Sequence, residues 1–123
     1  MPAPHLTFTV SGTRISEVSG YDHITVGFSS DIEYAAFECR ATKAGESYGR
    51  GVGRLIAGFS TTPAEVERSF DIYDYDLVSG EGDYLIGLYA QSTDGVWNDN
   101  PAFIPLGSTG LITADGDKFL CMG

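Results

Sequence analysis

Residues 77–90 read LVSGEGDYLIGLYA, and this stretch decides the fold class. Leu77 and Gly80 precede Tyr84, which opens a run with an apolar residue at every second position. Successive side chains of a strand point to opposite faces, so this alternation predicts a strand with one buried face. The glycines before Tyr84 indicate a turn. The stretch therefore predicts a strand of an antiparallel sheet that begins near Tyr84.

Short alternating runs of the same kind recur along the chain, and no long pattern of helical period accompanies them. They cover residues 5–10, 22–29, 33–42, 50–59, 66–72 and 96–104, with Gly, Asp, Ser and Pro between them. Strict alternation places Phe37 and Cys39 on one face of their run and Tyr34 on the other. Glycines within residues 50–59 indicate an edge strand or a bulge. Many short strands separated by turns predict an all-β, two-sheet antiparallel sandwich of about seven strands.

The spacing of Leu77, Gly80 and Tyr84 resembles the signature around the sixth strand of fibronectin type III domains. The resemblance covers about residues 6–106 and implies an immunoglobulin-like sandwich. In that family the tyrosine forms a corner, packing its ring across the sheet junction while its hydroxyl satisfies a backbone group. The family usually has a core tryptophan in the second strand, where this chain has Phe28. The one tryptophan of the chain is Trp97, near the last loop.

The chain is expected to consist of a sandwich over residues 1–106 and an appendix over residues 107–123. Residues 107–110 are predicted to be a linker, and residues 111–120 a short hairpin around Asp115 and Gly116. A lone hairpin is barely stable in water, so it would dock on the domain, pair with another subunit or stay mobile. The ending TADGDKFL resembles short modules of phage and prophage tail- and fibre-associated proteins.

The charge balance argues against nucleic acid as a partner. The chain has 17 acidic and 7 basic residues and a net charge of −10, whereas binding to phosphates needs clustered Lys and Arg. Basic residues gather between residues 40 and 54 and acidic ones between 65 and 83. This layout is either a solvated surface or an aid to head-to-tail packing of identical copies.

The sequence contains few signals that indicate where the protein is located or whether it forms disulfides. The first residues lack the basic start and apolar core of a signal peptide, and no apolar stretch reaches the length of a membrane span. We therefore expect a soluble chain, either virion-associated or cytoplasmic, with no membrane insertion. Cys39 and Cys121 are too few for a disulfide framework, and Cys39 is expected to be a buried free thiol.

No arrangement typical of catalysis is found. His5 and His23 lack a nearby nucleophile motif and an orienting third group, so we predict that the chain is not an enzyme and needs no cofactor. Zinc ligands do not cluster. Asp74, Asp76 and Asp83 are weak candidates for calcium, although their spacing is not that of an EF-hand.

Candidate binding residues lie in two places. Trp97, with Tyr89, Tyr73 and Tyr75, is expected either to pack in the core and at the corner or to form an aromatic platform for a sugar ring. Asn98 and Asp99 lie in the same loop as Trp97. Arg50 and Arg54 flank the glycine-rich run, where charge and glycine protect an edge from pairing with another chain.

These features leave three hypotheses about function, of which a small hydrolase is the least supported. The first is a non-catalytic structural or interaction module, such as a tail or decoration domain of a phage or prophage particle. Its partners would be other structural proteins, a cell-surface glycan or, weakly, further copies of the chain. The alternative is a carbohydrate-binding module that uses exposed aromatic residues near Trp97.

Overall fold

A computed structural model describes residues 3–12, 14–16, 23–79 and 82–109, which form eight strands and one short 3-10 helix. The elements are β1 (Leu6–Ser11), β2 (Arg14–Ser16), β3 (His23–Ser30), β4 (Tyr34–Lys43), β5 (Arg54–Phe59), β6 (Arg68–Tyr73), η1 (Asp74–Asp76), β7 (Gly82–Ser92) and β8 (Ala102–Thr109). Within this part of the chain no helix is long and apolar enough to cross a membrane.

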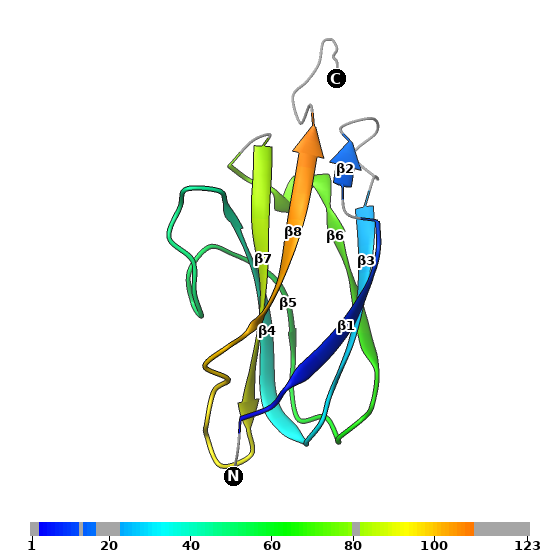
Figure 1. Ribbon diagram of the computed structural model, residues 1–123, viewed down its shortest axis with the longest axis vertical. Coiled ribbons are helices and arrows are strands. Elements are labelled where there is room, and N and C mark those ends of the chain that lie inside the picture. Colours follow the sequence, from blue (N-terminus) through cyan, green and yellow to red (C-terminus); the bar gives the residue numbers. More distant parts are fainter. Residues whose placement is uncertain (1–2, 13, 17–22, 80–81, 110–123) are drawn as a thin grey trace.

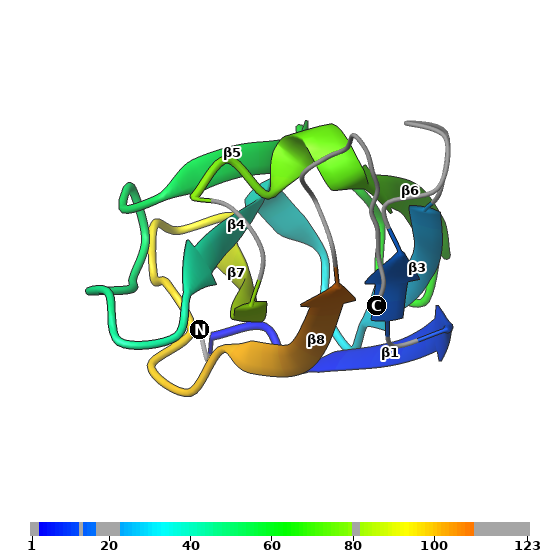
Figure 2. The ribbon, with the colours of Figure 1, turned by 90° about the horizontal axis from the view of Figure 1, so that it is seen from above.

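The strands form two sheets that face each other. One sheet has the order β1-β3-β6 and the other β2-β8-β7-β4-β5. Neighbouring strands are antiparallel except β2, which runs parallel to β8. The two sheets form opposite walls of the molecule (Figures 1 and 2). The prediction of an all-β, immunoglobulin-like sandwich is confirmed, and β5 is an edge strand as its glycines indicated.

An aromatic cluster fills the space between the sheets. Phe28 of β3 is 1% exposed, and its ring stacks on that of Phe37 with centroids 4.2 Å apart. Tyr34 is also fully buried, against the prediction that it lies opposite Phe37. A bulge shifts the register of β4 between Tyr34 and Ala36, and this extra residue turns both aromatic side chains inward.

Cys39 lies in β4 with its thiol in the core. The side chain is fully buried and the thiol is free. Burial raises the pKa of this thiol, and the negative charge of Asp76 raises it further. Cys39 therefore stays protonated and packs as a small apolar side chain. Cys121 lies outside the described residues.

Tyr84 joins β7 to the segment that precedes it. The side chain is 4% exposed, and its hydroxyl donates a hydrogen bond of 3.1 Å to the Leu77 carbonyl. Burial raises the pKa of the Tyr84 phenol, so the hydroxyl remains a donor. Leu77 is itself buried, whereas Gly80 lies outside the described residues.

Replacing Tyr84 by Phe removes this donor and leaves the buried Leu77 carbonyl without it. We expect the free energy of unfolding to fall by about 1–3 kcal/mol, the usual cost of an unsatisfied buried polar group. Denaturant titration measures the loss. Tyr75→Phe is the control, because that side chain is 61% exposed. Equal stability of the two variants would show that the Tyr84 hydroxyl contributes nothing.

The last described strand continues past the expected end of the sandwich. β8 extends to Thr109, so residues 107–109 form a strand and not the predicted linker. They extend because β2 pairs alongside them, with Ile15 opposite Ser108. Ile15 is fully buried and anchors this short strand in the core. The hairpin predicted around Asp115 lies outside the described residues.

Candidate functional site

A cavity of about 620 Å³ lies on the outer face of the larger sheet. It is open to solvent and is lined by residues 48–50, which precede β5, by residues 97–101, which precede β8, and by the side chains of Tyr89 and Phe103. The two loops that contribute these segments project from the same side of the molecule (Figure 1). Residues far apart in the sequence thus form one site.

Strand register explains why Tyr89 and Phe103 reach the outer face. The inward side of β7 carries Ile86 and Leu88, which are fully buried. Tyr89 and Gly87 therefore point away from the core. Phe103 of β8 lies directly opposite Gly87 and shares its face. The Tyr89 side chain is nonetheless only 6% exposed, since the two loops cover it.

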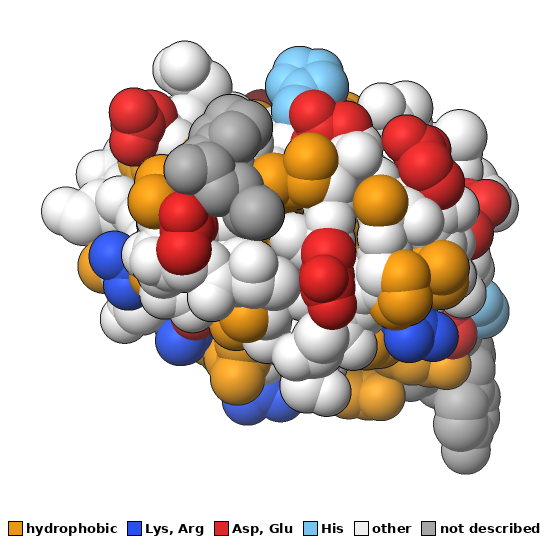
Figure 3. Space-filling view, turned by 90° about the horizontal axis from the view of Figure 1, so that it is seen from below, with side chains coloured by type: hydrophobic (Ala, Val, Ile, Leu, Met, Phe, Trp, Pro, Cys, Tyr) orange, Lys and Arg blue, Asp and Glu red, His pale blue; other side chains and the backbone are white. Residues whose placement is uncertain are grey.

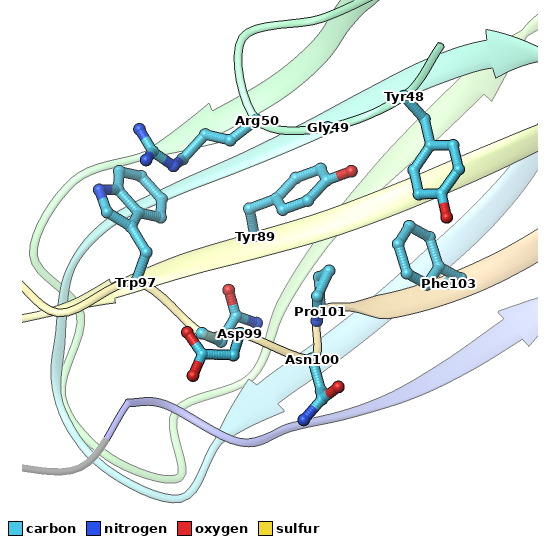
Figure 4. Close-up of a pocket in the computed structure, with 10 residues that line it drawn as sticks. Tyr48, Gly49, Arg50, Tyr89, Trp97, Asp99, Asn100, Pro101 and Phe103 are labelled. Atoms are coloured by element: carbon cyan, nitrogen blue, oxygen red, sulfur yellow. The ribbon is translucent and has the colours of Figure 1, made fainter. Parts of the chain in front are cut away.

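The aromatic side chains of the cavity form a row (Figure 4). The ring of Tyr89 meets that of Phe103 edge-to-face at 6.2 Å, and Phe103 meets Tyr48 in the same way at 5.4 Å. Trp97 lies at the other end of the row, half-buried, while Tyr48 is 59% exposed. Burial raises the pKa of the Tyr89 phenol, and the nearby Glu38 carboxylate raises it further.

Gly87 allows the Tyr89 ring to lie flat against the sheet. A Cβ atom at position 87 would stand 2.6 Å from the Tyr89 hydroxyl oxygen and 2.8 Å from a ring carbon. Any other residue at position 87 would push the ring outward into the cavity. Gly87 interrupts the alternating apolar run of β7, and the position of the Tyr89 ring in the site depends on this glycine.

The loop that carries Tyr48 and Arg50 is fixed to β4 by two charged side chains. The Glu38 carboxylate accepts a 2.7 Å hydrogen bond from the Gly51 N–H and pairs with Arg40 at 3.1 Å. Arg40 also donates to the Gly53 carbonyl at 3.1 Å. Gly53 has φ of +88° and packs so closely that a Cβ would lie 2.6 Å from the Ala41 carbonyl oxygen. These contacts hold the loop in one conformation.

The loop that carries Trp97 is fixed to β7 by Asn98. The Asn98 N–H donates to the Ala90 carbonyl, and its side-chain oxygen accepts from the Ala90 N–H, both at 3.0 Å. Upstream, Val96 donates to the Ser92 hydroxyl at 3.0 Å, and that hydroxyl bonds to Asp94. The Ser92 hydroxyl lowers the pKa of Asp94. Asn98 lines the cavity, yet its side-chain oxygen is engaged in holding the loop.

Two arginines flagged together in the sequence have different surroundings. The Arg50 guanidinium lies over the Trp97 ring, 4.3 Å from its centre, at the cavity (Figure 4). Arg54 does not line the cavity and bonds to the Asp76 carboxylate at 3.4 Å. Arg54 begins β5 and contacts Asp76 of η1, whereas Arg50 lies in the preceding loop beside Trp97, so only Arg50 remains a candidate at this site.

The acidic candidates for calcium are not gathered into a site. The Asp76 carboxylate accepts from the Tyr73 N–H at 3.0 Å and pairs with Arg54. Asp74 begins η1, whereas Asp83 is an exposed residue of β7. Over the described ranges, no three His, Cys, Asp or Glu side chains are grouped so that they could hold a metal ion. The calcium hypothesis gains no support.

The structure brings five of the residues singled out in the sequence together at the cavity: Trp97, Tyr89, Asp99, Asn98 and Arg50. Tyr73 and Tyr75 stack on each other and do not line it. That the five residues bind a ligand stays a prediction, and the rest of the cavity was not predicted. Tyr48 and Phe103 were not singled out, because one lies in a glycine-rich loop and the other in a run interrupted by proline. Glu38 and Arg40 were also missed. Their positions on the outward face of a strand, next to a loop with four glycines, were the available signal.

Comparison with known proteins identifies the sandwich and no more. No protein-family model matches the chain, and no curated protein matches it. Among solved structures, the crystal structure of an LPMO from Kitasatospora papulosa is similar, with 13% sequence identity and a TM-score of 0.50. The match covers 79% of this chain and 50% of that one. At this identity the likeness shows the fold alone.

This neighbour corrects one prediction. The absence of a catalytic motif had predicted that the chain is not an enzyme, yet an LPMO is an enzyme and has the same fold. That prediction is therefore contradicted, since an enzyme is built on this sandwich. The comparisons give no support to the expected place in a phage or prophage particle.

Proposed function

We propose that the chain is a carbohydrate-binding module whose site is the aromatic cavity between residues 48–50 and 97–101. The observation that carries the proposal is the row of four aromatic side chains beside polar groups in one cavity. Rings of this kind pack against the apolar faces of sugars. Amide and carboxylate groups, which Asn100 and Asp99 supply here, form hydrogen bonds with sugar hydroxyls.

The dimensions and rigidity of the cavity support this proposal. Its volume of about 620 Å³ falls in the range of small-ligand sites, roughly 300–1,000 Å³. Its loops are already fixed by Glu38, Arg40 and Asn98. A ligand that enters a preformed site avoids the entropic cost of ordering loops.

A glycan microarray followed by calorimetric titration tests the proposal. Tyr48 and Tyr75 form a matched pair, since their side chains are 59% and 61% exposed and only Tyr48 lines the cavity. For a glycan bound by the wild type, we expect Tyr48→Ala to weaken binding by about tenfold, which corresponds to ~1.4 kcal/mol. Tyr75→Ala is expected to bind as the wild type does.

Two outcomes count against the proposal. One is the absence of any glycan that binds the wild type on the array or in solution. The other is an equal loss of affinity in the two tyrosine variants, which would place the glycan outside the cavity.

A further inference from the structure

Arg50 presents its charge at the cavity. Its side chain is exposed, and its guanidinium lies over the Trp97 ring. Contact with a ring face uses no N–H group, so the planar fork of donors remains available. Within the described ranges, no carboxylate forms an ion pair with Arg50.

The other described basic side chains are engaged. Arg40 pairs with Glu38, and Arg54 pairs with Asp76. The Lys43 ammonium donates to the Ser79 carbonyl at 3.3 Å, and Arg68 donates to the Thr62 hydroxyl at 3.5 Å. Lys43 and Arg68 also lack a carboxylate partner, but each donates a hydrogen bond to a protein oxygen, whereas within the described ranges Arg50 makes no such bond. A free arginine fork at the edge of a cavity is suited to an acidic group of a ligand.

We propose that the glycan is acidic and carries a hexuronate unit whose carboxylate pairs with Arg50. This inference rests on the proposed function and names its ligand class. An arginine fork matches the two oxygens of a carboxylate in a bidentate pair. With the guanidinium over Trp97, the carboxylate lies at the Trp97 end of the aromatic row, and the sugar ring extends along the open part of the cavity towards the exposed Tyr48.

The negative net charge of the chain favours a short acidic ligand over a long one. A charge of −10 repels long polyanions, but exposed charges are screened beyond about 8 Å at physiological salt. Acidic side chains are scattered singly over the end seen in Figure 3, with apolar side chains between them. The exposed Asp99 carboxylate also lines the cavity and disfavours a second acidic group beside it. A short oligosaccharide with one carboxylate at Arg50 satisfies both conditions.

The test compares acidic oligosaccharides with their own methyl esters. Trisaccharides to pentasaccharides of galacturonate, of glucuronate-containing hyaluronan and of alginate are titrated by calorimetry at 0.15 M salt, beside neutral glucans and xylans. Methyl esterification removes the charge of the carboxylate and keeps the sugar ring. We expect at least one acidic oligosaccharide to bind more tightly than the neutral ones and to lose about tenfold or more in affinity on esterification.

Arg50→Gln is expected to cause the same loss for the free acid and almost none for the ester. This non-additivity shows that the two groups interact directly. Arg50→Lys is expected to recover part of the affinity, since it keeps the charge and loses the fork. Lys43→Gln is the control, because it removes the same charge outside the cavity.

Three results overturn the inference. The first is that a neutral glycan binds most tightly and that Arg50→Gln does not change its affinity. This result rules out an acidic ligand but is compatible with the proposed function. The second is that Arg50→Gln and Lys43→Gln lose equal affinity, which would mean that the net charge of the chain, and not the position of Arg50, causes the loss. Failure of every glycan to bind removes the inference together with the proposed function.

Discussion

Phe28→Ala is expected to lower the free energy of unfolding by about 3–5 kcal/mol, the usual cost of truncating a buried phenylalanine. Phe28 is 1% exposed and lies at the centre of the aromatic cluster between the sheets. Its ring stacks on Phe37 and contacts Phe70 edge-to-face, with centroids 6.1 Å apart. Domains of this size are stable by only about 5–15 kcal/mol, so the variant is expected to be close to unfolding.

Urea titration followed by circular dichroism measures this loss. Leu55→Ala is the control, since it truncates a large apolar side chain of edge strand β5 that is 49% exposed. We expect the control to change stability by no more than about 0.5 kcal/mol. If Phe28→Ala unfolds at the same urea concentration as Leu55→Ala, the described packing of the core is wrong.

Trp97→Ala is expected to weaken glycan binding by about 30-fold or more, or ~2 kcal/mol. The indole supplies the largest aromatic face of the cavity, and it also supports the Arg50 guanidinium. Removal of the indole therefore takes away the stacking surface for the sugar and also the ring that supports the Arg50 guanidinium. Calorimetric titration with the best glycan from the array measures the loss.

Two further variants separate binding from folding. Trp97→Phe keeps an aromatic face and is expected to recover part of the affinity. Trp97→Ala should keep its β-sheet circular dichroism spectrum, because Asn98 continues to bond Ala90 and holds the loop. Wild-type affinity in a folded Trp97→Ala protein would place the ligand elsewhere on the surface.

The sandwich could be predicted because its strands follow simple alternation. Residues 77–90 indicated the strand that became β7, and the Tyr84 hydroxyl meets the Leu77 carbonyl. The alternation failed at Tyr34, where a bulge adds a residue to one strand. It also gave no sign of β2, because three residues are too short to show a period.

The candidate site was harder to predict than the fold. Trp97 stood out as the one tryptophan, but nothing local connects it with Tyr48, which is brought near by the path of β4 and by Glu38. Arg50 and Arg54 have the same chemistry in the sequence. Their roles diverge because Asp76 lies beside one of them and Trp97 beside the other.

The most direct test of the proposed carbohydrate site uses the single tryptophan of the chain. Its indole N–H gives one signal in a nitrogen–proton correlation spectrum, and this signal comes from the cavity. On titration with the tightest-binding glycan, we predict that the signal shifts along a saturating curve whose Kd equals that from calorimetry. Amides of residues 48–50 and 97–101 should shift with it. An indole signal that stays in place at saturating glycan would contradict the account.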